Sequence, residues 1–435
     1  MRSRQQQRPS WFALLSGVAA ERPALAKMAH RVRGHCGSQW YRPVGTTPLH
    51  RRYSIQPRRL QRPFHALMTF GRGDLGQLGF GAAMESVSEP TILQEAPLRK
   101  RFIHASASWS QNMVITEEQE VYSWGTAGLA LGIPHRGANA YYPTYVESCR
   151  ALKLKTVCCG RHHTVALNTR GEVFAWGDND LGQVGIVEGQ KEGVPQPVRL
   201  EKLRKSGAIT EIACGLDHSL ALTDDQRVWG WGFGVDGQVG NGSPDIVREP
   251  VLLDTRAVRV KKVRCGTDFS ALLGEDGYIY TFGSSEIGQL GHGKKGVLMH
   301  PTAIESIPDA VEDVACGGAH SLALTVKGEV YSWGYGGYGR LGHGDNHDSS
   351  IPEKIDFFDD KDVKSIHAGG GQSFVCTADG TVYAFGLAAE GRLGLPNAPE
   401  GIATPTPIPG LAGHKVVHLA PGIDHTLVVV EAPPE

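Results

Sequence analysis

Cysteine and histidine recur together along this chain, and both side chains can bind a metal or take part in catalysis. One repeated phrase contains both residues in three of its copies, as Cys159 with His163, Cys214 with His218 and Cys316 with His320. Another copy has Cys265 without a His, and the last has His425 without a Cys. Zinc sites need two close pairs that converge on one ion, whereas these pairs recur only every 51 to 55 residues or more. The spacing therefore predicts no metal site. We expect His163, His218, His320 and His425 to hydrogen-bond neighbouring loops, and the four cysteines to be small buried core residues.

Other catalytic patterns are missing from the sequence. Glycine patterns such as GRGDLG and GFGVDG lie in predicted turns, and none opens a helix that could bind phosphate. We find neither a Gly-x-Ser-x-Gly elbow nor a Ser-His-Asp set. The sequence predicts a non-catalytic protein without a cofactor.

The elements that must position these residues are set by a repeat. A Trp-Gly or Phe-Gly step occurs seven times, at intervals of 51 to 55 residues, and short apolar runs bounded by Gly-containing turns surround each step. Such runs form antiparallel hairpins, and a repeat of this length cannot bury its apolar face alone. We predict an all-β fold, a seven-bladed β-propeller of antiparallel four-stranded blades. The repeat aromatics Trp124, Trp176, Trp231 and Trp333 should pack between adjacent blades.

The chain ends complement each other. Residues 65–71 supply a strand and a Phe-Gly step without the Cys-Gly phrase, and residues 416–430 supply that phrase without a Trp-Gly step. We therefore expect one blade to contain strands from both ends, which removes the free sheet edges of an open ring. The propeller should span residues 65–430, followed by a tail at residues 431–435.

The first 63 residues have a different composition. They hold 13 basic residues and one acid, which leaves the remaining 372 residues a formal charge of −13. An Arg-rich, acid-poor leader is typical of mitochondrial import. RRYS, at residues 51–54, is similar to a matrix peptidase site, so we predict a cleaved transit peptide at residues 1–53 and a linker at 54–64. Cleavage should leave Ser54 at or near the mature N-terminus.

Two alternatives remain for the leader. WFALLSGVAA followed by ALA is similar to a secretory signal, although its Ser and Gly and the continuing Arg content disfavour that interpretation. Internal starts at Met28 or Met68 would shorten or remove the leader. No run reaches the apolar length of a spanning helix, so membrane association would be peripheral.

The phrases CGRHHTVALN, CGLDHSLALT and CGGAHSLALT, each followed by a Trp-Gly step, resemble the repeats of the regulator of chromosome condensation family. The resemblance covers about residues 65–430 and implies a seven-bladed propeller. The leader and the ending GIDHT are most similar to the mitochondrial exchange-factor-like branch. That branch is associated with mitoribosome assembly and with exchange on an inner-membrane dynamin-related GTPase.

The resemblance also implies candidate contact residues. In the family's exchange factor, the variable positions between Gly and His line the face that contacts a small GTPase, and a short hairpin helps to displace nucleotide. The matching residues here are Arg161, His162, Asp217, Asp268 and Asp424, with Ile186, Val187 and Glu188 opening the hairpin at residues 186–194. We expect solvated loop residues at these positions, so that Asp217→Ala would leave the melting temperature unchanged.

Three functions follow from the resemblance. The first is a mitochondrial scaffold, in the matrix or at the inner-membrane periphery, for assembly of ribosomal or RNA-processing components. The second is nucleotide exchange on a small or dynamin-related GTPase. The third, a sensor like the ultraviolet-B photoreceptor, is disfavoured because only Trp109 and Trp229 lie outside the leader and the repeat steps. The acidic ring disfavours direct nucleic-acid binding. A nuclear location is a further alternative, and we expect the protein to be a monomer.

Overall fold

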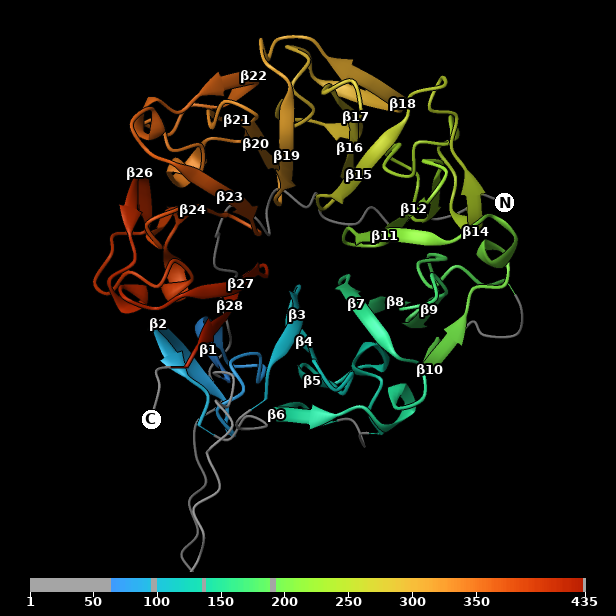
Figure 1. Ribbon diagram of the computed structural model, residues 1–435. Coiled ribbons are helices and arrows are strands. Elements are labelled where there is room, and N and C mark those ends of the chain that lie inside the picture. The colour runs from blue at the N-terminus through green and yellow to red at the C-terminus, as the bar shows by residue number, and fades with distance from the viewer. Residues whose placement is uncertain (1–63, 95–99, 135–137, 188–192, 433–435) are drawn as a thin grey trace, which may run out of the picture. The chain divides into compact units, whose positions relative to one another are not determined.

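A computed structural model describes residues 64–94, 100–134, 138–187 and 193–432 of the chain. The predicted leader at residues 1–53 and most of the linker lie outside these ranges. The described residues form seven four-stranded antiparallel sheets arranged around one axis (Figure 1). Helices among them are limited to single 3-10 turns, and none has the length and apolar character needed to traverse a bilayer.

Each sheet is one blade, and we number the blades I to VII. Their strands are, in chain order within each blade: blade I, β3 (Phe102–Ala107), β4 (Gln111–Thr116), β5 (Val121–Gly125) and β6 (Ala140–Tyr145); blade II, β7 (Leu154–Cys159), β8 (His163–Asn168), β9 (Val173–Gly177) and β10 (Val194–Arg199); blade III, β11 (Ile209–Cys214), β12 (His218–Thr223), β13 (Val228–Gly232) and β14 (Val247–Leu252); blade IV, β15 (Val260–Cys265), β16 (Phe269–Gly274), β17 (Ile279–Ser285) and β18 (Gly296–Ile304); blade V, β19 (Val311–Cys316), β20 (His320–Thr325), β21 (Val330–Gly334) and β22 (Ser349–Lys354); blade VI, β23 (Val363–Ala368), β24 (Gln372–Thr377), β25 (Val382–Leu387) and β26 (Gly401–Pro407); blade VII, β1 (His65–Gly73), β2 (Met84–Ile92), β27 (Val416–Pro421) and β28 (His425–Glu431). The 3-10 turns lie in the connections: η1 (Leu129–Leu131), η2 (Glu147–Cys149), η3 (Leu203–Lys205), η4 (Gly337–Gly339), η5 (Asp356–Phe358), η6 (Ala389–Gly391) and η7 (Pro409–Leu411).

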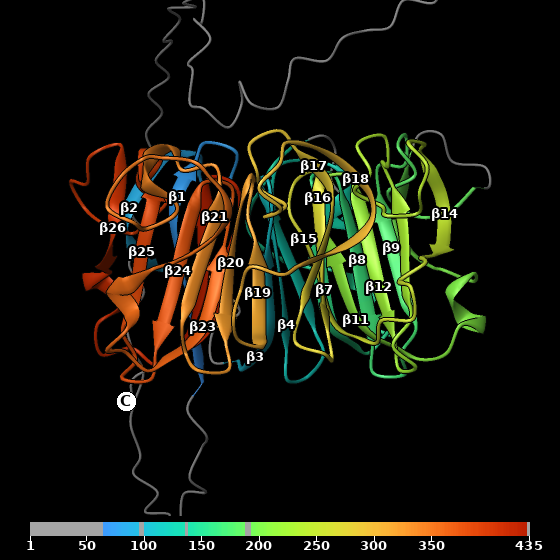
Figure 2. The same ribbon diagram turned by 90° about the horizontal axis from the view of Figure 1, so that it is seen from above.

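Within a blade the strands are ordered from the axis outward, and in the side view each strand runs through the thickness of the ring (Figure 2). The second strand from the axis carries an apolar run such as HSLALT in β12, and in blades I to V it is buried along its whole length. The equivalent strands β24 and β28 are buried except for one residue each. Because strand side chains alternate between the two faces of a sheet, a strand buried on both faces must lie between neighbouring blades. The burial pattern is therefore a consequence of radial stacking.

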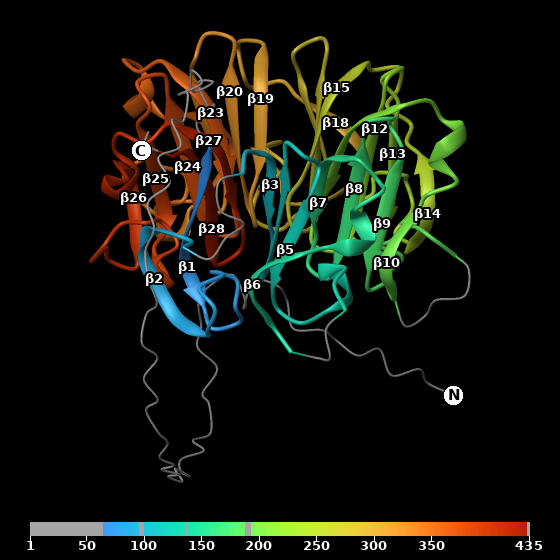
Figure 3. The same ribbon diagram turned by 60° about the horizontal axis from the view of Figure 1, so that its bottom comes forward.

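Blade VII closes the ring with strands from both chain ends. β28 pairs with β1 from His65 opposite Glu431 to Gly71 opposite His425, and the sheet order is β27-β28-β1-β2. Figure 3 shows the N-terminal pair beside the C-terminal pair. The predicted fold and its closure are confirmed, and β28 reaches Glu431, one residue into the predicted tail.

Aromatic side chains join each blade to the one before it. Trp231 of blade III is fully buried and donates its indole N–H to the Gln183 carbonyl of blade II at 3.0 Å. Gly185 of blade II has a φ of +84°, and a Cβ there would lie 2.9 Å from the Trp231 ring. Glycine is required at this place for its left-handed backbone and because the incoming ring occupies the position of a side chain.

The same contact recurs at every junction between blades. The aromatic residues are Phe70, Trp124, Trp176, Trp231, Phe282, Trp333 and Phe385, and the glycines opposite them are Gly394, Gly79, Gly132, Gly185, Gly240, Gly291 and Gly342. The cores follow this arrangement: one buried cluster combines Leu427 of blade VII with Val114 and Trp124 of blade I. The apolar core of the protein thus lies in the seams between blades.

Replacing Trp176 tests the seam between blades I and II. Trp176→Ala should lower the free energy of unfolding by about 3–5 kcal/mol, because it removes a fully buried ring. Trp176→Phe should cost only about 1 kcal/mol, since the Ala130 carbonyl that accepts from the indole also accepts from Thr164. Denaturant melts of both variants measure the difference, and equal losses would contradict this account of the seam.

Candidate partner-binding face

The loops that carry the predicted contact residues lie on one face of the ring. In blade II, His163 at the start of β8 pairs with Gly177 at the end of β9. The loop before His163 and the loop after Gly177 therefore leave the sheet at the same edge. The same register holds in the other blades, for example His218 opposite Gly232. This face is called the loop face below.

A closed belt of hydrogen bonds connects the Cys-Gly loops around the axis. Each of the seven seams has one such bond, six of them 2.7 to 3.2 Å long: Ser108 Oγ to Gly160 O, Arg161 N to Leu216 O, Leu216 N to Thr267 O, Thr267 Oγ1 to Gly318 O, Gly318 N to Gly369 O, Gly370 N to Gly422 O, and Ile423 N to Ser108 O. The belt fixes each loop relative to its neighbours. Side chains on the loop face are consequently held by a rigid frame.

The repeat histidines hydrogen-bond side chains of the next blade. His218 Nε2 lies 2.9 Å from Ser270 Oγ, His320 Nε2 2.8 Å from Ser373 Oγ, and His425 Nε2 2.8 Å from Asn112 Oδ1. His163 makes the same contact with Ser219 at 2.9 Å. Among the described residues, no group of three or more His, Cys, Asp or Glu side chains could hold a metal ion.

The partners of these histidines determine which ring nitrogen carries the proton. Ser270 donates its own hydroxyl to the Gln238 carbonyl, so it accepts from His218 Nε2–H. Ser373 likewise donates to the Arg340 carbonyl, and Asn112 Oδ1 can only accept, so His320 and His425 also carry their proton on Nε2. The Nδ1 atoms of His163, His320 and His425 are buried without a hydrogen-bond partner. Burial accordingly lowers the pKa of His163, His218, His320 and His425 to about 3.

Arg161 and Asp217 form an ion pair across the seam between blades II and III. Arg161 Nε lies 3.2 Å from Asp217 Oδ1, and a second bond joins Arg161 Nη2 to Asp217 Oδ2. The Asp217 side chain is 6% exposed and that of Arg161 15%. The expectation that Asp217 is a solvated loop acid is therefore wrong: the ring brings a cation from the neighbouring blade against it.

Asp268 lies beside this pair and is half-buried. Burial raises its pKa to about 7, with further contributions from Asp236 and Asp217, while the charge of Arg161 acts in the opposite direction. Burial and the nearby Glu286 also raise the pKa of Asp236. Arg161, Asp217 and Asp268 thus come together in one partly buried, acid-rich group on blades II to IV.

Asp424 belongs to a different part of the loop face. Its carboxylate lies 2.7 Å from Arg392 Nη1 of blade VI and 3.6 Å from Arg72 Nη1 of its own blade. Arg392 occupies the repeat position that holds Gln183 and Gln238 in blades II and III. Asp424 therefore joins blades VI and VII and is separate from the Arg161 group.

The predicted wedge is only partly described. Ile186 is half-buried, and its carbonyl accepts from Asn179 Nδ2 at 2.9 Å. Val187 is 59% exposed, whereas Glu188 lies outside the described residues. His162 is also exposed. These two exposed side chains, together with Val235 (41% exposed) in the loop after β13, are accessible on blades II and III.

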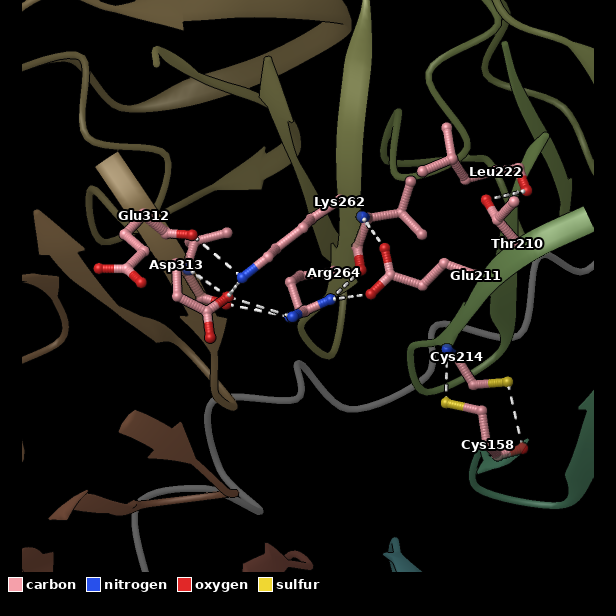
Figure 4. Close-up of polar contacts among 11 residues, drawn as sticks. Cys158, Thr210, Glu211, Cys214, Leu222, Lys262, Arg264, Glu312 and Asp313 are labelled. Carbon is pink, nitrogen blue, oxygen red and sulfur yellow. Dashed lines mark hydrogen bonds and ion pairs between the residues drawn. The ribbon is translucent and has the colours of Figure 1, made fainter. Parts of the chain in front are cut away.

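A second charged group lies on the inner strands. Arg264 of β15 contacts Glu211 of β11 at 2.6 Å and Asp313 of β19 at 3.1 Å, so it connects blades III, IV and V (Figure 4). Lys262 lies 3.0 Å from Asp313. These basic residues are part of an inter-blade network, which the sequence did not indicate because their acids lie about 50 residues away.

Sequence reasoning also missed three features of this face. Asp236 and Glu286 sit in loops after the Trp-Gly or Phe-Gly step, and only the fold brings them near Asp268. Arg392 could have been found, because aligned repeats show Arg where other blades have Gln. Cys158 adjoins a repeat cysteine without belonging to the repeat, and it lines the end of the central channel together with Cys214, Cys265 and Cys316.

Comparison with known proteins identifies the repeat. The RCC1-like domain family matches residues 127–432 of the chain. The Arabidopsis thaliana ultraviolet-B receptor UVR8 is 30% identical over 333 residues, 75% of this chain and 74% of the receptor. The A. thaliana RCC1 domain-containing protein RUG3, described as mitochondrial, is 28% identical over 85% of this chain and 89% of its own length.

A solved structure agrees with the fold. The crystal structure of human WBSCR16 superposes with a TM-score of 0.75 at 25% identity, covering 85% of this chain and 99% of that chain. Some other curated relatives are far longer, and the chain spans as little as 7% of their length. The four repeat tryptophans of the present chain lie in four different seams, one to a seam.

Removal of the Asp217 carboxylate should destabilise the protein. Asp217→Ala leaves the Arg161 guanidinium buried without this carboxylate, and we expect a loss of about 3 kcal/mol in the free energy of unfolding. Asp180→Ala, an exposed acid on the same face of blade II, is the matched control and should change stability by less than about 0.5 kcal/mol. Thermal and denaturant melts decide, and identical melts of both variants would contradict the buried pair.

Stability should fall with mild acid. The buried histidines have lower pKa values folded than unfolded, so their contribution is complete above pH 6.5 and is lost as the pH falls toward 3. At pH 5.5 each buried histidine lowers the free energy of unfolding by on the order of 1 kcal/mol. Blade VI has a glutamine, Gln372, at the place that His320 occupies in blade V. The His320→Gln variant should therefore show a shallower loss of stability between pH 6.5 and 5. An unchanged slope in melts of this variant would refute the assignment.

Proposed function

Because this chain belongs to the RCC1-like domain family, we propose that it is a mitochondrial protein-interaction module that scaffolds assembly of ribosomal or RNA-processing components. The observation that carries the proposal is the loop face of blades II and III. There the exposed His162 stands on a loop that the closed hydrogen-bond belt and the Arg161–Asp217 pair hold in place. The exposed Val187 and Val235 stand on the adjoining loops, which begin with N–H groups of Asp178 and Phe233 bonded to the carbonyls of His162 and Asp217. Rigid loops with exposed apolar and polar side chains favour protein recognition.

The mitochondrial location has two supports of different kinds. The leader is rich in Arg and nearly free of acids, which is the composition of an import sequence. The relative RUG3, which the chain matches over 85% of its length, is described as mitochondrial. Location in the matrix or at the inner-membrane periphery is part of the same proposal.

Binding rather than bond-making chemistry is supported by the way polar groups are used. The histidines that sequence spacing singles out are held neutral and bound to the next blade, so they are not available as acid–base groups near neutral pH. Asp217 is likewise paired with Arg161. What the loop face offers a partner is shape, exposed apolar side chains and acidic charge.

Exchange on a GTPase is the second candidate, and Asp268 is the observation that favours it. A half-buried acid whose pKa is raised toward 7 by burial and by other acids would be stabilised by an incoming basic side chain. Together with Val187 on the predicted wedge, it provides charge and an apolar side chain on one face, which displacement of a nucleotide requires.

A pair of surface variants tests which function holds and which face is used. Val187→Asp alters the loop face, and Val326→Asp alters the β20–β21 turn at the opposite edge, where Val326 is 61% exposed. In pull-downs from isolated mitochondria, Val187→Asp should reduce recovery of ribosomal or RNA-processing proteins about tenfold, or 1.4 kcal/mol. Wild type and Val326→Asp should recover them equally.

Nucleotide release from candidate mitochondrial GTPases is measured in parallel by stopped-flow fluorescence. The scaffold predicts no acceleration by any of these proteins. Acceleration that Val187→Asp abolishes and Val326→Asp preserves would establish exchange instead. Equal loss of partners in both variants would show that the loop face of blade II is not the binding surface.

A further inference from the structure

Five cysteines line a cavity of about 190 Å³ at one end of the central channel. They are Cys158 and Cys159, the last two residues of β7, and Cys214, Cys265 and Cys316, at the ends of β11, β15 and β19. All five are free thiols, and all except Cys159 are half-buried, so the expectation that all repeat cysteines are buried core residues holds for Cys159 but is wrong for the other three. Much of the remaining lining comes from the loops of the hydrogen-bonded belt, including their Gly residues.

Cys158 and Cys214 contact each other across the seam between blades II and III. The Cys214 backbone N–H donates to Cys158 Sγ at 3.1 Å, and the Cys214 thiol donates to the Cys158 carbonyl at 3.3 Å. Figure 4 shows the two side chains lying side by side between the strands. Each sulfur is therefore held against the backbone of the other cysteine, so the two side chains lie next to each other across the seam.

The two sulfur atoms have different environments. Hydrogen bonding by Cys214, which donates its backbone N–H to Cys158 Sγ, lowers the pKa of Cys158, and the charge of Arg264 acts in the same direction, while burial opposes both. Burial raises the pKa of Cys214. A stabilised thiolate beside a protonated thiol is the arrangement found in reactive dithiols, since the thiolate is the nucleophile.

The other cysteines near the axis differ from this pair. Burial raises the pKa of Cys159 and of Cys316 to about 12, and it also raises that of Cys265. Thiols of this kind stay protonated at neutral pH and react slowly. Cys158 is thus distinguished from the other cysteines of the cavity by the hydrogen bond that its sulfur accepts from the Cys214 N–H and by its lowered pKa.

We propose that Cys158 and Cys214 form an oxidation site for hydrogen peroxide, in which Cys158 reacts first and Cys214 resolves the product. The Cys158 thiolate attacks one peroxide oxygen, the O–O bond breaks, and with one proton from solvent this yields Cys158 sulfenic acid and water. The Cys214 thiol then attacks that sulfur, forms the S–S bond and releases a second water. Overall the two sulfurs lose two electrons, and one peroxide is reduced to two waters.

The resulting bond would act on the loop face. Arg161 follows Cys158 by three residues, and Asp217 follows Cys214 by three residues, so the disulfide would join the same two loops that the ion pair joins. A covalent link between blades II and III reduces the conformational freedom of the unfolded chain, and in the folded protein it ties the two blades together at their seam. The oxidised ring should therefore melt at a higher temperature than the reduced ring.

The test uses the full propeller, reduced and then treated with hydrogen peroxide at pH 7. Free thiols are blocked, and a non-reducing digest is analysed by fragmentation mass spectrometry. We expect a Cys158–Cys214 crosslink that dithiothreitol reverses, with Cys158 consumed at least about tenfold faster than Cys265. Cys214→Ser should instead accumulate a sulfenic acid at Cys158 that dimedone traps.

The matched variants use residues that other blades carry at the equivalent places. Two other blades have an alanine, Ala213 or Ala315, at the position of Cys158, and two have an alanine, Ala107 or Ala368, at the position of Cys159. The variants Cys158→Ala and Cys159→Ala should therefore both fold. Only Cys158→Ala should abolish the crosslink and the rise in melting temperature. A crosslink that survives Cys158→Ala, that is lost in Cys159→Ala, or that fails to form while other cysteines oxidise would overturn the proposal.

Discussion

The architecture depends on one repeated contact, the ring of each blade's Trp or Phe packed against a glycine of the preceding blade. A Cβ at Gly185 would lie 2.9 Å from Trp231, and the equivalent distance at Gly240 to Phe282 is 2.5 Å. Blades can approach closely enough to exclude water only because this position lacks a side chain. Since the ring is closed, the contact must be made at each of seven seams, and the last of them requires strands from both ends of the chain.

Close approach of the blades has a second consequence at the loop face. It brings the Cys-Gly loops within hydrogen-bond distance of one another, so backbone groups that would otherwise end unpaired at the channel are satisfied by the next blade. The same approach places each repeat His against a Ser or Asn of its neighbour and excludes the water that a charged imidazole would need. Polar residues that resemble a catalytic or metal set thereby become part of the scaffold.

The seam between blades II and III differs from the other seams. It carries a buried ion pair, a thiol pair and the loops with exposed Val187 and Val235. Buried charge and reactive sulfur are costly to keep in a structural junction, because apolar residues of similar size would serve packing equally well. Their concentration where accessible side chains gather supports assigning partner recognition to this part of the ring, and it links the redox state of the sulfurs to the loops that would meet a partner.

The sequence by itself determined the architecture. Seven Trp-Gly or Phe-Gly steps, the turn glycines and the complementary ends define the blades, their strands and the closure, because these follow from local spacing and from the need of each repeat to bury its apolar face. It also located the loops that carry Arg161, Asp217 and Asp268. Only the tertiary structure decided that Asp217 is paired and buried, that Asp424 lies in another seam, and that Cys158 meets Cys214. Each of these contacts joins residues more than 30 positions apart, on different blades, and a repeat pattern specifies what each blade contains but not which side chains meet across the gap between two blades.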